Sequence, residues 1–385
     1  MNKPYIYVLI FLCFYACQQK RANFKKEDTN VYIPLPKVLH PKNNLSSPKK
    51  IHLGKLLFYD PILSGNKDIA CATCHHPNYA YAENIDLSIG TNATGLGSKR
   101  KFKKPNSIPL VKRNAHTILN TAYNGINIKG TYNPEKAPMF WDNRAKSLEE
   151  QALMPITTLE EMRGQTIDEN IILDTVIHRL KNIPEYRFLF QKAFPNNPVI
   201  TTSNLSKAIA CFERTLSSNN SRFDNYLKGE TNAISETEKE GFRLFKKAKC
   251  NQCHSGPMFS DYKIHTLGLP DNEKLNISDD GFKKNYGFRT PTLRNLRHTG
   301  PYMHNGTLKT LLQVLEFYED ISTGKPQNPL VAPSKTDPLA KEIRLKVKDM
   351  SFIISFFNTL NNEDIDNETP KQVPSGLTVG GAIYN

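Results

Sequence analysis

The segments Cys71-Ala-Thr-Cys74-His75 and Cys250-Asn-Gln-Cys253-His254 decide how this sequence of 385 residues is interpreted. Each places two thiols one helical turn apart, with a histidine directly after the second thiol. With this spacing the two cysteines can form thioether bonds to haem vinyl groups, and the histidine can ligate the haem iron. A shared zinc site would need four converging ligands, but nearly 180 residues separate the two pairs. The two motifs therefore predict two covalently bound haem c groups.

A weak internal repeat precedes the two motifs. Gly54-Lys-Leu-Leu-Phe58 stands before the first and Gly241-Phe-Arg-Leu-Phe245 before the second, so both carry G-x-x-L-F on an amphipathic helical pattern. Ser235 and Glu238 predict a capping box at the start of the second helix. Helical spacing recurs at 148–153, 171–180, 205–216, 308–318 and 343–360, and no segment shows the sustained alternation of a sheet. We therefore expect a mostly α fold with two cytochrome c-like domains, 46–228 and 229–361, each with one haem c.

Residues 1–17 have the features of a bacterial lipoprotein signal peptide. Lys3 gives a positive start, the apolar stretch 5–15 is short for a membrane span, and the small residue Ala16 precedes Cys17. We therefore expect an exported, periplasmic protein with a lipid anchor at Cys17. Export agrees with the haem motifs, because haem c is attached outside the cytoplasm. Residues 18–45 are polar and contain prolines, which predicts a tether, and residues 362–385 are predicted to be a flexible tail.

The remaining cysteine and the net charge predict neither a structural disulfide nor a nucleic-acid partner. Cys211 lies in a helical pattern and is predicted to be a buried, inert thiol, so no structural disulfide is expected. The net charge of +14 is spread along the chain and no nucleic-acid motif accompanies it, so we expect no nucleic-acid partner. One local cluster is predicted to be a solvated loop, with docking to an acidic protein or anionic lipid as the alternative. It comprises Lys99, Arg100, Lys101, Lys103, Lys104, Lys112 and Arg113.

Four further segments are distinctive. They are Phe140-Trp-Asp-Asn-Arg-Ala145, Leu148-Glu-Glu-Gln-Ala152, Thr290-Pro-Thr-Leu-Arg-Asn295 and Pro301-Tyr-Met-His-Asn-Gly306. With the two haem motifs, they closely resemble the bacterial di-haem cytochrome c peroxidase and MauG family, in the family's order from about residue 45 to 360. The resemblance implies an enzyme that reduces hydrogen peroxide at the first haem with electrons supplied through the second.

The resemblance also assigns roles near the first haem. Trp141 matches the residue that lies between the haems and relays electrons, although a plain core tryptophan remains the alternative. Glu161 matches the distal glutamate, which takes a proton from one peroxide oxygen and delivers it to the other. Only the family's spacing favours Glu161 over the neighbouring Glu160. Gln151 and Pro155 match further distal positions and are expected to shape access.

A calcium site between the domains is also implied. Asn114, Thr299 and Pro301 match the family's positions for it. A side-chain amide and main-chain carbonyls are hard oxygen ligands that suit this ion, with waters completing the shell. A turn-forming role for these residues is the alternative.

Two departures from the family's pattern bear on the subclass. No histidine occurs from Tyr79 to Lys112, where the peroxidases often carry one that caps the first haem. His116 stands where the family usually has proline, and we expect it to leave the distal side of the first haem open. Tyr318 stands fourteen residues after His304, where the peroxidases have an axial methionine and MauG-like proteins a tyrosine. Tyr318 is therefore the expected ligand of the second haem, with Met303 or Met350 as alternatives.

Together these features predict a MauG-like di-haem peroxidase. Its reductant is expected to be a small cytochrome or copper protein, or tyrosine and tryptophan side chains of a partner protein. The sequence leaves homodimer formation open. The rival from another class is a dihaem electron-transfer cytochrome without catalysis, and a structural or partner-binding lipoprotein is a further rival. The first predicts two six-coordinate haems that do not respond to peroxide.

Overall fold

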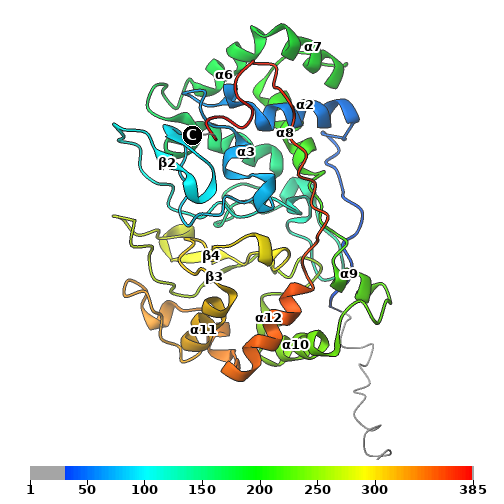
Figure 1. Ribbon diagram of the computed structural model, residues 1–385, viewed down its shortest axis with the longest axis vertical. Helices are drawn as coiled ribbons and strands as arrows, with labels where there is room; N and C mark the ends of the chain where they lie inside the picture. Colours follow the sequence, from blue (N-terminus) through cyan, green and yellow to red (C-terminus); the bar gives the residue numbers. More distant parts are fainter. Residues whose placement is uncertain (1–30, 384–385) are drawn as a thin grey trace, which may run out of the picture.

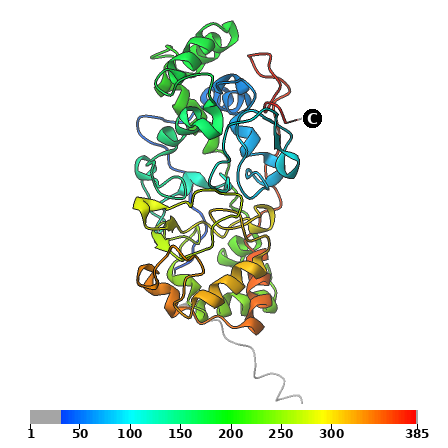
Figure 2. The ribbon, with the colours of Figure 1, turned by 90° about the vertical axis from the view of Figure 1, so that its left-hand side faces the viewer.

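The computed structural model describes residues 31–383. Over this range the chain forms two lobes stacked along the long axis, seen from two directions in Figures 1 and 2. The predicted signal peptide and the predicted anchor Cys17 lie outside the described residues. No helix within 31–383 combines the length and the apolar character that a membrane span requires.

The first lobe contains most of the helices. These are α2 (Pro48–Tyr59), α3 (Cys71–Cys74), α4 (Leu148–Gln151), α5 (Met154–Thr157), α6 (Ile172–Lys181), α7 (Pro184–Ala193) and α8 (Thr202–Glu213), with a π-helical turn at Leu159–Arg163. The second lobe contains α9 (Arg222–Leu227), α10 (Glu236–Lys247), α11 (Leu311–Ile321) and α12 (Met350–Asn358). The predicted helical segments therefore all contain helices, with shifted ends.

The strands that the described residues form are short. Strands β1 (Ala93–Thr94) and β2 (Lys101–Phe102) form one antiparallel pair, and β3 (Ile264–Thr266) and β4 (Gly287–Arg289) form another. Long loops make up much of the rest, held by hydrogen bonds between distant segments. The predicted mostly α fold is confirmed.

The repeated G-x-x-L-F segments build the same helix crossing in both lobes. In the first, α2 packs on α8, and a Cβ on Gly54 would lie 1.9 Å from the carbonyl oxygen of Ala208. In the second, α10 packs on α12, and a Cβ on Gly241 would lie 2.0 Å from the carbonyl oxygen of Phe352. Only glycine lets the two backbones approach this closely. Leu57 and Phe58, like Leu244 and Phe245, are buried beside these crossings.

Helix α10 begins as the sequence predicts. The Ser235 hydroxyl accepts from the Glu238 main-chain N–H at 3.3 Å, and the Glu238 carboxylate accepts from the Ser235 N–H at 2.7 Å. This reciprocal pair satisfies two donors that the first helical turn leaves without a partner. It fixes where the second lobe's main helix begins, and hence the register of the haem motif that follows it.

The C-terminal segment differs from the predicted flexible tail over 362–385. From α12 it runs back along the molecule and ends on the first lobe beside α3 (Figure 1). The Ser375 hydroxyl donates to the buried Asp60 carboxylate at 2.6 Å, and the Gly380 main-chain N–H donates to the Tyr59 carbonyl at 2.8 Å. Val373 joins the core of the first lobe. Composition indicated a mobile tail, but these buried polar anchors hold the segment in place.

The described end of the predicted tether is also packed. Tyr32 is buried in the second lobe, where its ring stacks on Phe259 at 4.9 Å between centroids. Its hydroxyl donates to the main-chain carbonyl of His254 at 3.0 Å. The part of 18–45 that the structure describes therefore supports the second haem motif directly. Cys211 is buried as predicted, and the described cysteines form no disulfide.

Candidate active site: two haem motifs and the segment between them

The first motif forms α3, whose position depends on a buried threonine. The Thr73 hydroxyl accepts from the Ala70 main-chain N–H at 2.9 Å and donates to the Gly380 carbonyl at 2.7 Å. The ring atom Nδ1 of His75 lies 3.1 Å from the Tyr81 carbonyl oxygen. An N–H at Nδ1 donates to that carbonyl and leaves Nε2 free for a metal. Burial lowers the pKa of His75 to about 4, so the ring is neutral, as a ligand must be.

The second motif repeats this geometry on a shorter turn. The Nδ1 atom of His254 lies 2.9 Å from the Phe259 carbonyl oxygen, which again leaves Nε2 for the metal. Burial lowers the pKa of His254. A largely apolar cavity lies beside this motif and is lined by Cys250, Cys253 and His254. Two thiols, an oriented imidazole and an apolar cavity are the parts that a covalently bound haem needs, so the residues fit this group.

Glu161 is held in the first lobe by its main chain. It lies in the π-helical turn at Leu159–Arg163, and its carbonyl accepts from the Thr91 main-chain N–H at 2.8 Å. Gly90 is in close contact, since a Cβ there would lie 2.3 Å from the same carbonyl oxygen. The Arg100 guanidinium, which is buried, fixes this loop by donating to the Gly90 carbonyl at 2.6 Å. The loop 89–91 therefore sets the position of Glu161.

The carboxyl group of Glu161 has an unusual acidity. Burial raises its pKa to about 7, and the positive charge of Arg144 only partly opposes this effect. Burial also raises the pKa of the Cys71 thiol to about 12, with the charges of Glu213 and Glu161 acting in the same direction. Glu161 therefore lies in the electrostatic neighbourhood of the first haem motif. A carboxyl with a pKa near 7 can both accept and donate a proton at neutral pH.

Gln151 and Pro155 precede Glu161 on the same run of short helices. Gln151 ends α4 and is half-buried, and Pro155 lies in the first turn of α5. α4 contacts α5, and α5 contacts the π-helical turn that carries Glu161. The three residues that the sequence grouped at the distal side therefore lie on consecutive, contacting elements.

Trp141 lies between the two lobes. Its indole N–H donates to the Asn114 main-chain carbonyl at 3.0 Å, and its own carbonyl accepts from the Arg289 N–H in β4 at 2.6 Å. The side chain is buried and lines the cavity of the second motif. The hydrogen bond from Arg289 ties the tryptophan main chain to the second lobe, so Trp141 is fixed from both sides.

His116 fills the space between Trp141 and the first motif. Its ring meets the indole edge-to-face, with 5.4 Å between centroids and 65° between planes. Burial lowers the pKa of His116 to about 3, and the charges of Arg289 and His75 contribute in the same direction. His116 also lines the cavity of the second motif. It therefore lies on the path between the two motifs, beside His75.

The residues predicted to bind calcium lie together at the junction of the lobes. Asn114, Thr299 and Pro301 all line the cavity of the second motif. The Asn114 side-chain N–H donates to the Ile85 carbonyl at 2.7 Å, which leaves its amide oxygen available as a ligand. Its main-chain N–H donates to the His304 carbonyl at 2.7 Å. An amide oxygen with main-chain carbonyls is a donor set of the kind that Ca²⁺ accepts.

Tyr318 and Met303 both line the cavity of the second motif, whereas Met350 does not. Tyr318 lies on α11, and burial raises the pKa of its phenol. Met350 is buried among the helices of the second lobe instead. The structure therefore leaves Tyr318 and Met303 as candidate axial ligands from the predicted three.

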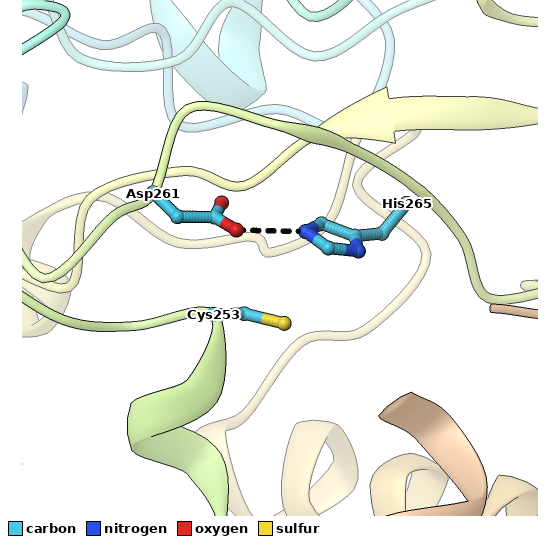
Figure 3. Close-up of side chains that lie close together, drawn as sticks. All are labelled: Cys253, Asp261 and His265. Carbon is cyan, nitrogen blue, oxygen red and sulfur yellow. Dashed lines mark hydrogen bonds and ion pairs between the residues drawn. The ribbon is translucent and has the colours of Figure 1, made fainter. Parts of the chain in front are cut away.

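His265 is a site residue that the sequence interpretation missed. Its ring bridges two carboxylates, with Nε2 at 3.1 Å from Asp261 and Nδ1 at 2.7 Å from Asp337. Figure 3 shows Cys253 directly beside this pair. Burial alone would lower the pKa of His265, but hydrogen bonds to acidic neighbours, Asp261 first, raise it above the ordinary value of a histidine. His265 is therefore a cation at this edge of the second haem motif. In the sequence, the spacing of four residues between Asp261 and His265 is the only indication of this pair.

Cys253, Asp261 and His265 are also close enough to suggest a metal site. Among residues 31–383 they are the one such group of histidine, cysteine and acidic side chains, with ligand atoms within 4.8 Å of one another. However, the Cys253 sulfur belongs to a thioether in a haem c protein, which removes the strongest ligand of the three. The cluster is therefore explained by the haem motif.

Two buried carboxyl groups near the first motif were also missed. Burial raises the pKa of Glu83 to about 7 and that of Glu213 to about 8. Glu83 accepts a long hydrogen bond of 3.5 Å from the Ile89 N–H, and the Oε2 atom of Glu213 has no hydrogen-bond partner. No sequence motif marked either residue, because burial of an acidic side chain depends on the tertiary fold.

Two oriented histidines, four paired thiols and an aromatic link between the lobes define a two-haem redox protein. A family model described as di-haem cytochrome c peroxidase matches residues 48–232. The methylamine utilization protein MauG of Methylorubrum extorquens is 36% identical over 331 residues, covering 85% of this chain and 82% of that protein. The cytochrome c551 peroxidase of Nitrosomonas europaea is 32% identical over 332 residues, covering 84% of this chain and 83% of that protein.

The solved structures agree with these relatives. The crystal structure of a MauG-like protein associated with microbial copper homeostasis superposes with a TM-score of 0.66 and 28% identity, covering 86% of this chain and 95% of that one. The chain belongs to the di-haem cytochrome c peroxidase family. It is accordingly a di-haem oxidoreductase of the peroxidase type, and the family implies two haem c groups. The predicted family and enzyme class are confirmed.

Proposed function

We propose that this protein reduces hydrogen peroxide at the His75 site with electrons that enter at the His254 site, in the manner of the MauG-like subclass. The observation that supports this division most directly is the placement of acidic groups. Glu161, with a pKa of about 7, lies in the electrostatic neighbourhood of Cys71 in the first motif, whereas Tyr318 and Met303 line the cavity of the second. A carboxyl group that exchanges a proton near neutral pH is thus the feature that supports peroxide chemistry at the first site.

Haem iron, when bound at His75, supplies a redox-active centre at which a peroxide oxygen can be reduced. The Glu161 carboxylate accepts the proton of one peroxide oxygen and delivers it to the other, which then leaves as water. Two electrons and two further protons complete the reduction of peroxide to two waters. The Tyr81 carbonyl keeps the His75 ring oriented throughout, through its hydrogen bond with Nδ1.

The link between the sites is formed by Trp141 and the residues that fix it. The indole ring lines the second cavity, and the His116 ring packs on it from the direction of His75. An aromatic π-system at this position shortens the gap that an electron must cross. Since His116 lies on the same side as His75, its position supports an open distal side at the first haem.

Tyr318 is proposed as the axial ligand of the second haem, with Met303 as the alternative that also lines the cavity. An anionic oxygen ligand stabilises oxidised iron, whereas a thioether raises the potential. Calcium bound by Asn114, Thr299 and Pro301 would brace the main chain that accepts the Trp141 hydrogen bond. Two covalently bound haem c groups and one calcium ion are thus the proposed cofactors.

The reductant is proposed to be a small cytochrome or copper protein, or tyrosine and tryptophan side chains of a protein substrate as the MauG-like subclass implies. From the signal-peptide features of residues 1–17, we also propose export to the periplasm and a lipid anchor at Cys17. The rival function is electron transfer without catalysis. The raised pKa of the half-buried Glu161 favours the peroxidase, because a simple carrier needs no proton-transfer group.

Absorption and electron paramagnetic resonance spectra of the purified holoprotein, before and after one equivalent of peroxide, test this function. We expect a high-spin ferric component that peroxide converts, followed by its return when a reductant is added. Two low-spin haems that do not respond to peroxide would establish the electron-transfer rival instead. A Tyr318→Met variant tests the axial ligand through the reduction potential of the low-spin haem, measured by redox titration. If Tyr318 is the ligand, the substitution should raise this potential. If Met303 is the ligand, the potential should stay unchanged.

A further inference from the structure

Two stretches of exposed basic side chains lie beside the second haem cavity. We define this basic collar as Lys247, Lys249, Lys341, Arg344, Lys346 and Lys348, all of them exposed. The first two lie at the end of α10, directly before Cys250, and the other four lie in the segment that leads into α12. Two stretches about a hundred residues apart in the sequence therefore contribute to one surface.

Two hydrogen bonds hold these stretches together at the haem motif. The Arg344 main-chain N–H donates to the Ala248 carbonyl at 3.1 Å, and the Gln252 side chain donates to the Glu342 carboxylate at 2.7 Å. The second bond partly occupies the one exposed carboxylate inside the collar. The remaining acidic residue there, Asp349, is half-buried. The collar therefore presents a surface of predominantly positive charge.

The collar also borders the place where an electron must enter. Lys249 is exposed and at the same time lines the second haem cavity, together with Cys250 and Gln252. Ile343 and Leu345, within the second stretch of the collar, line the cavity from the other side. A protein that covers the collar would thus lie next to Cys250, which lines the cavity.

The centre of the second stretch is apolar. Val347 lies between Lys346 and Lys348 and is 71% exposed, among the most exposed large hydrophobic side chains of residues 31–383. Neither lysine has an acidic side chain within ion-pair distance in that range. An apolar contact surrounded by charges of one sign is the arrangement by which charged redox partners are attracted and then released.

We propose that the basic collar is the docking surface for an acidic one-electron carrier protein, whose negative face meets the collar while its redox centre faces Cys250. This inference rests on the proposed function, since it names the class of reductant for the same site. Each docking event oxidises one carrier and passes one electron to the second haem. Two such events supply the two electrons that reduce one peroxide to two waters.

The test uses the holoprotein with two matched double variants. Lys346→Glu with Lys348→Glu reverses two collar charges, and Lys101→Glu with Lys103→Glu reverses two exposed charges on and beside β2 in the other lobe (Figure 1). The total charge change is the same in both. Neither pair belongs to the catalytic machinery, and absorption and circular dichroism spectra would verify that both variants fold and carry haem.

Binding of an acidic single-haem cytochrome c to the oxidised protein is measured by calorimetry over a range of ionic strength. We expect Kd to rise with salt, and to rise about tenfold or more in the collar variant, with less than about twofold change in the β2 variant. Peroxide-dependent oxidation of the reduced cytochrome should slow in parallel. A Lys346→Gln, Lys348→Gln variant should fall between the wild type and the charge reversal.

Three results would overturn the docking surface. In the first, both double variants weaken binding equally, which would show that only the net charge matters. In the second, a basic cytochrome binds the wild type as tightly as the acidic one. In the third, the collar variant still binds the carrier but no longer binds phosphatidylglycerol vesicles, which would identify a lipid surface as the partner. Turnover of peroxide with hydroquinone, a small neutral reductant, keeps the two proposals apart. If hydroquinone supports no turnover in the wild type, the proposed peroxidase function fails, whatever the binding results.

Discussion

The two haem regions share one frame and differ in what surrounds it. Both lobes cross two helices at a glycine, Gly54 or Gly241, and both fix the ligand histidine by a hydrogen bond from Nδ1 to a carbonyl. That carbonyl follows the histidine by six residues in the first lobe and by five in the second. The shared frame explains how each lobe can hold haem, but it does not explain two functions.

The difference lies in the polar groups that surround each motif. Around the first motif, the buried Glu83 and Glu213 and the half-buried Glu161 are carboxyl groups whose pKa values desolvation raises. Around the second motif, Asp261 and Asp337 hold His265 as a cation, and the cavity is lined by Tyr318. Carboxyl groups that gain and lose protons near neutral pH suit peroxide chemistry, whereas fixed charges suit electron transfer. The proposed difference between the two sites therefore rests on side chains outside the shared frame.

The largest effect should come from removing the proton-transfer group of the first region. Glu161→Gln keeps the shape of the side chain but cannot take up the peroxide proton, so peroxide turnover with hydroquinone should fall by about 10² to 10⁴. Glu160→Gln, at the neighbouring half-buried position, is the matched control and should change turnover by less than about twofold. Equal losses in both variants would remove the distinction between the two glutamates.

The pH profile of the same variants sharpens this comparison. Because burial raises the pKa of Glu161 to about 7, its carboxylate is protonated as the pH falls through that value. The wild-type rate should therefore fall below about pH 7, since only the carboxylate accepts a proton from peroxide. The Glu161→Gln variant should lack this step. A wild-type profile that is flat from pH 6 to 8 would contradict the assignment.

Local sequence motifs were sufficient to predict the two haem regions. The residues Cys71, His75, Cys250 and His254 follow from a spacing of five residues, because thioether attachment and ligation need only local geometry. Trp141 and Glu161 were identified through resemblance to the family, and the structure places both near the haem motifs. Spacing and resemblance therefore sufficed where the chemistry is carried by adjacent or family-specific residues.

What the sequence could not show depends on distant partners. His265 is held between Asp261, four residues before it, and Asp337, which is 72 residues away in the chain. Composition predicted the segment after 361 to be mobile, yet Asp60, buried in the other lobe, accepts hydrogen bonds from Ser375. A glycine-rich, polar composition indicates that a segment buries little surface by itself. It cannot show that a buried carboxylate elsewhere in the fold accepts hydrogen bonds from that segment.

The shared frame is tested by adding a methyl group at each helix crossing. Gly54→Ala and Gly241→Ala would each place a Cβ about 2 Å from a carbonyl oxygen of the crossing helix, so the helices must separate. We expect a loss of about 1–3 kcal/mol in the free energy of unfolding for each, and more if the helices cannot move. Denaturant unfolding of the holoprotein measures it. A clear loss in only one lobe would show that the repeat is not structurally equivalent.

The smallest expected effect concerns the acidic surroundings of the first region and their cost to stability. Burial raises the pKa of Glu213 to about 8, so the folded protein binds this proton more tightly than the unfolded chain. The stability that results is complete below the ordinary pKa of a glutamate and is lost as the pH rises through about 8. Glu213→Gln should therefore leave stability unchanged near pH 4 and raise it at pH 8, where the wild-type carboxyl must lose its proton.

Glu238 in the second region provides the opposite sign. Its pKa is lowered despite partial burial, because Arg222 and Ser235 donate hydrogen bonds to the carboxylate. This group contributes stability above the ordinary pKa of a glutamate, and that contribution is lost as the pH falls through its lowered value. Glu238→Gln should therefore destabilise the protein at pH 8, where Glu213→Gln stabilises it. Thermal unfolding of both variants at pH 4 and pH 8 measures these changes in stability. Changes of the same sign at pH 8 would show that the two regions do not differ in the effect of the carboxylate charge on stability.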